Sequence, residues 1–170
     1  QEMELALIRF GKFVNEQDGP GEGDRYIELA RFLLDNRQGG GPYDQSHLPV
    51  VQQYEAVGHA VRALYSYTAI ADVAMATVDP EYQSAVKSLS ENIANRKYYV
   101  TGSVGSDETS QGFGPNYSLP NDSSCESCAS VGELFFRNRM NLTYEDAVHA
   151  DLYEETLYNA LLGSLDLNGE

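Results

Sequence analysis

The sequence predicts an all-α fold made of about three helical hairpins, which is part of an (α/α)6 toroid. Apolar residues recur at spacings of three and four in six segments, and turns rich in Gly and Pro separate several of these segments. Convincing strands are scarce. Six helices in sequence form three hairpins of ~40–60 residues, the period expected for a solenoid or a closed α/α toroid. Three such hairpins make half of a six-hairpin barrel.

The first three helices are predicted from apolar spacing and from the turns that end them. The first covers about residues 2–15 and ends before Gly19-Pro20-Gly21. The second starts near Asp24 and is stopped by the Gly-rich run before Pro42. A loop through His47 leads to the third helix, over about 50–77, which is the longest and most apolar.

The fourth helix follows Asp79-Pro80, because Asp is a good N-cap and Pro a good first helical residue. Residues 98–100 are expected to be a short extended piece. Residues 101–122 form a loop rich in Gly, Ser, Asn and Pro, and loops of that length in a compact domain are often functional. The fifth helix is expected over about 126–139 and the sixth over about 144–162.

Composition limits the classes of partner. The net charge of -15 argues against nucleic acid and against an anionic membrane surface, because both need clustered Lys and Arg. No apolar run reaches membrane-spanning length. Both ends of the sequence lie in or just after helical patterns, so we expect residues 1–170 to be a single segment whose partner is the remainder of its own polypeptide.

Both cysteines lie in the run Cys125-Glu126-Ser127-Cys128. Two cysteines three apart fit a reducing compartment, hence a cytoplasmic location, or a metal site better than a disulfide framework. The run could be a redox motif, a pair of small apolar residues at a helix start, or a metal site. Glu126 and Cys128 can bind one ion only in a non-helical lead-in or first turn, because residues two apart on a helix diverge by about 200°. Two ligands leave zinc short of the usual four.

A polar stripe is predicted along one face of the third helix. Its members are Gln52, Glu55, His59, Arg62 and Ser66. The stripe is either a solvated face, with an internal pair from Glu55 to Arg62 or His59, or the lining of a substrate cleft contacted by His59. His47, on the loop before this helix, is a second candidate donor to substrate, and His149 is interpreted as a surface residue.

The long loop could supply a general acid, but its residues alone single out none. Its acidic members are Asp107, Glu108 and Asp122, and Gln111 lies between them.

Four stretches taken together resemble one family, the β-L-arabinofuranosidases of glycoside hydrolase family 127 and its relatives. They are QSHLPVVQQYEAVGHAVRA at 45–63, NRKYYVTGSVGS at 95–106, LPNDSSCESCAS at 119–130 and LYNALL at 157–162. The similarity runs from about Arg25 to the C-terminus. It implies an (α/α)6 catalytic barrel followed by β-sandwich domains, so that much of the protein lies outside this chain.

The resemblance also implies a retaining mechanism on plant-type β-L-arabinofuranosides, in which a cysteine thiolate is the nucleophile. Zinc, held by one Glu and three Cys, keeps that thiolate deprotonated. Glu126 and Cys128 match two of the four ligands, which makes a zinc half-site. The other two cysteines, including the nucleophile, come later in the family, and Cys125 is given no role. His59 and His47 match histidines of the sugar-binding pocket.

The family's general acid/base is a Glu two residues before the loop Phe, and that position here is Gln111. An amide cannot donate a proton as a carboxylic acid does. Either the chain is a variant at this catalytic position, or Glu108 takes over the role, or activity is lost. Two other functions therefore stay open: a catalytically silent carbohydrate-binding toroid and a structural helical repeat.

Overall fold

The structure, a computed structural model, describes residues 2–107 and 109–169. Within them, six α-helices make up most of the chain, and one small antiparallel sheet pairs Gly58 with Phe113 and His59 with Gly112. The elements are α1 (Glu2–Gln17), α2 (Asp24–Asp35), β1 (Gly58–His59), α3 (Ala60–Thr77), α4 (Pro80–Arg96), β2 (Gly112–Phe113), α5 (Ser127–Tyr144) and α6 (Ala147–Glu155). Among the described residues, no helix is both long and apolar enough to cross a bilayer.

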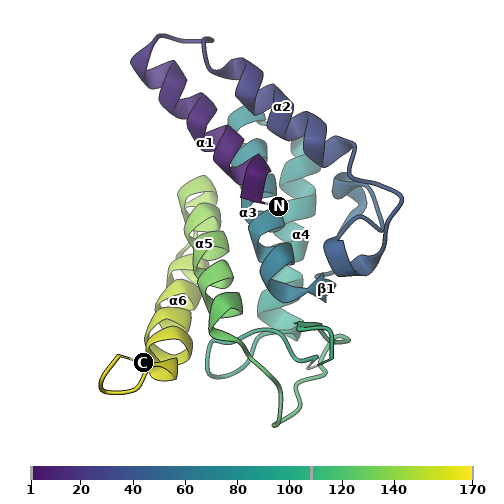
Figure 1. The fold of residues 1–170 in the computed structure, drawn as a ribbon, viewed down its shortest axis with the longest axis vertical. Coiled ribbons are helices and arrows are strands. Elements are labelled where there is room, and N and C mark those ends of the chain that lie inside the picture. The colour runs from purple at the N-terminus through teal and green to yellow at the C-terminus, as the bar shows by residue number, and fades with distance from the viewer. Residues whose placement is uncertain (1, 108, 170) are drawn as a thin grey trace.

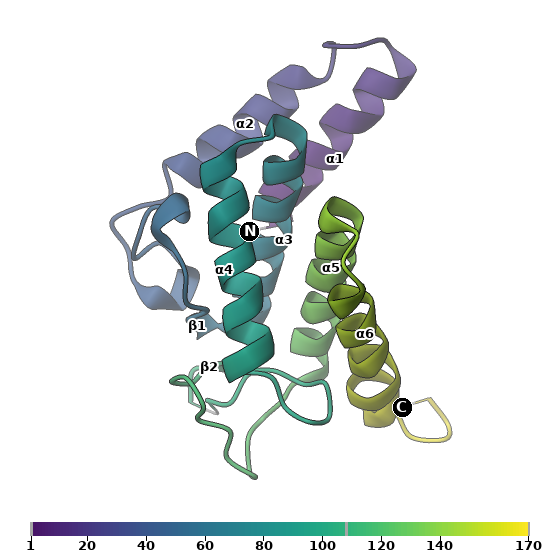
Figure 2. The ribbon, with the colours of Figure 1, turned by 180° about the vertical axis from the view of Figure 1, so that it is seen from behind.

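The helices form three successive hairpins arranged in two rows (Figures 1 and 2). α1, α3 and α5 pack side by side as one row, and each contacts its own hairpin partner, α2, α4 or α6. This alternation is the layering of an α/α toroid, with α1, α3 and α5 as the inner row and α2, α4 and α6 as the outer row. The prediction of an all-α fold forming part of a toroid is therefore confirmed.

The core is centred on α3, which is buried along most of its length between α1, α4 and α5. Its contact with α5 is the most extensive in the chain. Gly132 on α5 makes this close approach possible, because a Cβ there would stand only 3.0 Å from Cβ of Leu64. Farther along the same interface the rings of Tyr67 and Phe136 pack with centroids 6.0 Å apart. Small residues thus set the helix spacing and aromatic rings fill the remaining space.

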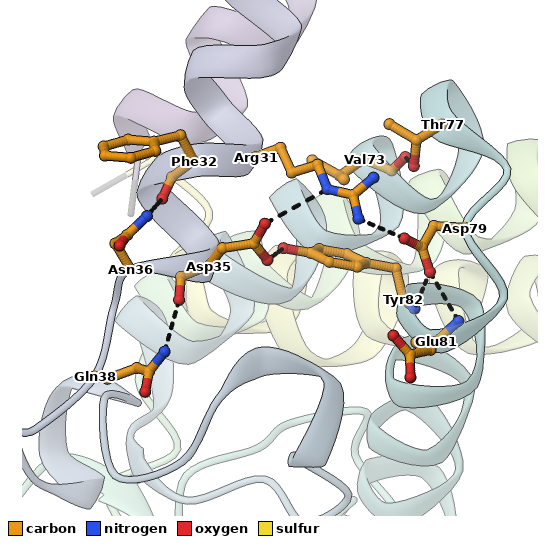
Figure 3. Close-up of polar contacts among 10 residues, drawn as sticks. All are labelled: Arg31, Phe32, Asp35, Asn36, Gln38, Val73, Thr77, Asp79, Glu81 and Tyr82. Atoms are coloured by element: carbon orange, nitrogen blue, oxygen red, sulfur yellow. Dashed lines mark hydrogen bonds and ion pairs between the residues drawn. The ribbon is translucent and has the colours of Figure 1, made fainter.

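Asp79 begins α4 as the sequence predicts. Its Oδ1 accepts hydrogen bonds from the backbone N–H groups of Glu81, at 2.9 Å, and Tyr82, at 3.3 Å. Its Oδ2 accepts from Arg31 of α2 at 2.6 Å, and the Tyr82 hydroxyl donates to Asp35 of α2 at 2.7 Å (Figure 3). The helix cap is therefore also the tie between two outer helices.

Asp79→Ala is expected to destabilise the protein by about 1–2 kcal/mol, because it removes the helix cap and leaves Arg31 without its closest carboxylate. Asp79→Asn should lose less than half of that amount, since its amide oxygen can still cap the helix. Urea denaturation of the full-length protein measures both changes. Equal losses in the two variants would show that capping is not the main contribution.

The third helix starts later than the sequence predicts. Residues 50–52 form a 3₁₀ turn, and α3 begins only at Ala60. Gly58 has φ +74° and passes so close to the Pro42 carbonyl that a Cβ would clash with it, which is a loop conformation and not a helical one. The predicted single-face stripe is consequently wrong. Gln52, Glu55 and His59 precede the helix, and Ser66 within it is buried.

The internal ion pair expected under the solvated-face alternative is also wrong. Oε1 of Glu55 accepts from Nζ of Lys97, 3.1 Å away, and not from Arg62 or His59. Lys97 is buried at the end of α4 and also donates to the Gly114 carbonyl at 2.7 Å. An isolated buried ammonium is costly, and these two acceptors offset that cost.

Three other predicted boundaries differ. Residues 98–100 form a turn instead of an extended piece, since Gly102 N–H bonds to the Tyr99 carbonyl at 2.8 Å. α5 continues to Tyr144, beyond the predicted end at 139. The sixth helix begins at Ala147 and changes to a π-helical stretch over Thr156–Leu161. There the Thr156 hydroxyl bonds to the Gly102 carbonyl, 3.0 Å away.

His149 is buried, contrary to the surface position predicted for it. The sequence showed only its acidic neighbours on α6, whereas the side chain lies in a cavity of about 370 Å³ shared with Ser90 of α4 and Met140 of α5. Burial, together with the Arg137 guanidinium, lowers the pKa of His149 below its ordinary 6.5, and Asp146 opposes this only in part. The imidazole is therefore held neutral.

The free energy of unfolding is expected to fall as the pH drops from about 7 to 5, in part because of His149. The unfolded chain takes up a proton below pH 6.5, whereas the folded protein resists protonation of this buried ring, so acid favours unfolding. His149→Gln should flatten the slope of stability against pH in this window. Denaturation of the full-length protein at several pH values measures it, and an unchanged slope would contradict the assignment.

Candidate functional site

Glu126 and Cys128 come together at the start of α5. Glu126 is the N-cap residue, with extended backbone at φ −62° and ψ 144°, and Cys128 lies in the first turn. Because the N-cap is not helical, the two side chains converge, and Oε2 of Glu126 lies 3.6 Å from Sγ of Cys128. The condition that the sequence set for a shared ligand site, a non-helical lead-in, is present.

Gln111 approaches the other oxygen of the same carboxylate. Its Nε2 donates to Oε1 of Glu126 at 2.9 Å. The backbone of Gln111 is left-handed, with φ 53°, and its carbonyl accepts from the N–H of Ala60 at 3.0 Å. The pairing of β1 with β2 fixes this geometry. Gln111 thus orients Glu126 so that its second oxygen faces the thiol.

His59 lies beside this cluster, because β1 pairs it with Gly112, the residue after Gln111. Its Nδ1 accepts from the backbone N–H of Arg62 at 3.4 Å and caps α3. Its ring meets Tyr43 edge to face, with centroids 5.6 Å apart. The Arg62 guanidinium lies over the Tyr43 ring, 5.1 Å from its centroid. Because Nδ1 is an acceptor, Nε2 is the nitrogen that carries the proton in the neutral ring.

Tyr43 is a site residue that the sequence interpretation missed. It lies in a short 3₁₀ turn, Pro42–Asp44, which precedes the predicted helix and has no periodic pattern of its own. The signal that could have pointed to it is an aromatic residue after Pro in a Gly-rich loop that precedes His47. Such loops commonly carry binding residues on a rigid scaffold.

Neither His47 nor Cys125 makes a hydrogen bond with Gln111, Glu126 or Cys128 in the described part of the chain. His47 is half-buried, and its Nδ1 has no hydrogen-bond partner there. The Cys125 sulfur lies 2.9 Å from the Ser123 hydroxyl, whereas the Cys128 sulfur faces Glu126, so the two free thiols have different partners. Glu108, the alternative acid, lies outside the described residues.

The inner helices bring their N-terminal ends to this region. A cavity of about 480 Å³ is lined by Glu2 and Met3 of α1 and by Val61, Arg62 and Tyr65 of α3. Burial raises the pKa of Tyr65, and the negative charges of Glu2 and Cys128 add to this increase. A larger cavity of about 540 Å³ lies between α5 and α6 and contains none of these residues. The candidate site is therefore identified by the chemical groups of its side chains and not by the volume of the cavity.

The Cys128 thiol is not activated by its own surroundings. Burial raises its pKa, and the Glu126 carboxylate raises it further, against the smaller opposing effect of backbone N–H groups at the helix start. A negative neighbour disfavours a second negative charge at this distance. The surroundings of Cys128 within this chain therefore disfavour its thiolate form.

The pair Glu126 and Cys128 fits a zinc ion. Ligand oxygen and sulfur at about 2.1 and 2.3 Å from a tetrahedral zinc lie about 3.6 Å apart. The Oε2–Sγ separation is 3.6 Å. Within the residues that the structure describes, no group of three or more His, Cys, Asp and Glu side chains is placed to hold a metal. The described residues therefore bring together two donors of the right kind and spacing.

Residues 7–170 match the family model described as the GH127 catalytic domain of β-L-arabinofuranosidase. The chain belongs to the GH127 family. A curated non-reducing end β-L-arabinofuranosidase from Bifidobacterium longum subsp. longum is 31% identical over 99% of this GH127 chain, which spans 28% of that protein.

Solved GH127 structures have the same fold. A GH127 β-arabinofuranosidase superposes with a TM-score of 0.89 at 40% identity, over 99% of this chain and 26% of its own. A GH127 β-L-arabinofuranosidase from Geobacillus stearothermophilus T6 gives 0.89 at 35% identity, over 100% of this chain and 29% of its own. This GH127 chain thus spans between a quarter and a third of the length of these relatives.

Proposed function

We propose that the full-length protein is a retaining β-L-arabinofuranosidase that acts on plant-type arabinofuranosides, and that this segment supplies part of its active site. The observation that carries the proposal is the convergence of Gln111, Glu126 and Cys128, which come from a loop and a helix start. Two relatives are named β-L-arabinofuranosidases, and a third is named a β-arabinofuranosidase. The carbohydrate substrate follows from the same names.

Glu126 and Cys128 would hold zinc as half of its ligand set, and the family resemblance assigns the other half to cysteines beyond residue 170. When bound, the ion supplies a positive charge that keeps thiolates deprotonated at neutral pH. Glu126 contributes one oxygen, while Gln111 donates to its other oxygen and fixes the orientation of the carboxylate. The nucleophilic sulfur lies outside this chain.

Three side chains are proposed to meet the sugar. Gln111 occupies the position of the general acid/base, where it can donate a hydrogen bond but cannot transfer a proton. His59 offers its Nε2 N–H to a sugar hydroxyl, since Nδ1 already caps α3. His47 is the less constrained of the two histidines, because its Nδ1 lacks a partner among the described residues.

The remainder of the polypeptide is proposed to complete the toroid on both sides of this segment. The first and last hairpins both expose large apolar side chains, and such surfaces are typical of interfaces. They are Met3, Phe10, Phe13, Leu29 and Phe32 at one end and Phe135, Leu142, Val148, Tyr158 and Leu162 at the other. A helix packed against each end would bury them.

The full-length protein is expected to bind about one zinc ion, and Glu126→Ala should reduce its zinc affinity at least tenfold, because a first-sphere ligand is lost. Elemental analysis after dialysis against a graded chelator measures both. Cys125→Ser is the matched control and should keep its zinc, since that sulfur bonds to Ser123. Undiminished zinc in Glu126→Ala would refute the half-site.

A catalytically silent carbohydrate-binding protein is the second candidate, and the amide at position 111 is the observation that favours it. Release of arabinose from a synthetic aryl β-L-arabinofuranoside by the full-length protein would exclude it. The cytoplasmic location inferred from the two cysteines stays a prediction.

A further inference from the structure

A groove of about 320 Å³ lies along the C-terminal half of α4, on the outer row of helices. It is lined by Glu91, Asn92, Asn95 and Arg96 of α4 and by two tyrosines from loops, Tyr54 and Tyr117. Both tyrosines are unusually exposed, at 69% and 70% of their surface. None of these residues belongs to the cluster of Gln111, Glu126 and Cys128.

A single buried amide holds the two loops that carry the tyrosines. Oδ1 of Asn92 accepts from the N–H of Ala56, two residues after Tyr54, at 2.9 Å. Nδ2 of Asn92 donates to Oδ1 of Asn116, the residue before Tyr117, at 3.0 Å. Asn92 therefore fixes both loops to the same turn of α4, and both tyrosines are positioned through it.

Tyr117 is held in an unfavourable backbone conformation. Its φ is 65°, in the left-handed region that a bulky aromatic residue rarely adopts. Its N–H donates to the Arg96 carbonyl at 2.8 Å, and the Arg96 guanidinium lies 6.0 Å from the centre of its ring. Such strain persists only where the surroundings impose it, and it is typical of binding sites. Here it presents a ring to solvent instead of burying it.

The floor of the groove is polar, and its side chains have hydrogen-bonding capacity to spare. Glu91 and Asn95 are exposed, and their side chains make no hydrogen bond with the described part of the chain. With Arg96 they offer a carboxylate, an amide and a guanidinium within two turns of one helix face. These groups hydrogen-bond to vicinal hydroxyls, and the tyrosine rings stack on C–H faces. A carboxylate beside a guanidinium leaves the lining near neutral, which disfavours a phosphorylated ligand.

We propose that this groove is a second carbohydrate-binding site, which takes one sugar unit of a neutral polysaccharide on the rings of Tyr54 and Tyr117. The choice of ligand rests on the proposed glycosidase function. The groove would hold a distant part of the polymer while the inner ends of α1, α3 and α5 hold the chain end that reacts. It raises affinity for the polymer through a second attachment point and takes no part in the reaction.

The test compares the full-length protein with a Tyr54→Ala/Tyr117→Ala double variant in affinity electrophoresis through a soluble arabinan. The double variant is expected to bind the arabinan at least about tenfold more weakly, since each stacked ring contributes on the order of 1 kcal/mol. Val100→Ala, which removes a strongly exposed apolar side chain after the end of α4 and outside the groove, is the control and should migrate like the unmodified protein. Turnover of a small aryl β-L-arabinofuranoside should be the same in all three.

Three outcomes would overturn the proposal. Absence of retardation in the unmodified protein, or equal retardation in the double variant, would show that the groove does not bind this polymer. A change in oligomeric state on size-exclusion chromatography would show that the tyrosines cover a protein interface instead. Turnover of the small substrate tests the glycosidase proposal separately. If the unmodified protein shows no turnover, but its retardation is lost in the double variant, the glycosidase proposal fails and the sugar site in the groove is retained.

Discussion

Gln111→Glu is expected to raise turnover of an aryl β-L-arabinofuranoside by the full-length protein about 10²–10⁴-fold, the usual contribution of general acid–base catalysis. The new carboxyl group would stand where the amide now lies 2.9 Å from Oε1 of Glu126. Two carboxylates at that distance repel each other, so one of them keeps its proton to a higher pH. A carboxylic acid that stays protonated near neutral pH is what a departing glycosidic oxygen requires.

Two controls show whether the gain comes from proton transfer. Gln111→Ala removes the side chain and should not raise turnover. The Gln111→Glu enzyme should show a new fall in rate toward alkaline pH, as its added acid ionises. If the substitution leaves both rate and pH profile unchanged, the acid lies elsewhere, and Glu108→Gln is the next variant to test.

Arg137→Met is expected to destabilise the protein by about 3–5 kcal/mol, the cost of leaving a buried charge without its partner. Arg137 and Glu133 are both fully buried on α5, and Nε of Arg137 donates to Oε1 of Glu133 at 2.6 Å. Nη1 also donates to the Ser90 hydroxyl of α4 at 2.6 Å. The guanidinium therefore links α5 to α4, two helices that belong to different hairpins.

A double variant at Glu133 and Arg137 distinguishes the cost of an unpaired buried charge from the loss of the contact itself. Glu133→Leu/Arg137→Met should recover most of the loss, since an apolar pair of similar volume has no charge to desolvate. Arg25→Met, at an exposed arginine on α2, should change stability by no more than about 0.5 kcal/mol. Guanidinium denaturation of the full-length protein measures all three variants, and a double variant as unstable as Arg137→Met would contradict the role of the unpaired charge.

The starts of helices that carry strong local start signals were predictable. α2 and α4 start at the predicted residues because a Gly-Pro turn precedes one and Asp79-Pro80 begins the other. α3 was placed too early because residues 50–59 carry apolar residues that continue the helical pattern. β1 occupies the end of that stretch through pairing with β2, and the pairing depends on a segment far along the chain. The periodicity of apolar residues within a short stretch of sequence cannot reveal such a long-range pairing.

The candidate site was predictable in its chemistry and only partly in its geometry. A carboxylate and a thiol in a helix lead-in indicated a shared ligand site, and the structure places them 3.6 Å apart. The contact of Gln111 with Glu126 required the loop to fold back onto the start of α5. His149 was misassigned because its acidic neighbours on α6 suggested solvent, while the residues that bury it lie on α4 and α5.

By itself the sequence determined the helical class, the hairpin order, the GH127 resemblance and which residues are candidates for binding zinc or sugar. These depend on local spacing, capping and the identity of side chains. Only the tertiary structure decided that Glu55 pairs with Lys97, that His149 is buried, and that Asn92 positions two exposed tyrosines. The physical reason is that each of these depends on segments distant in the chain, whose contacts are chosen by packing and by the satisfaction of buried polar groups.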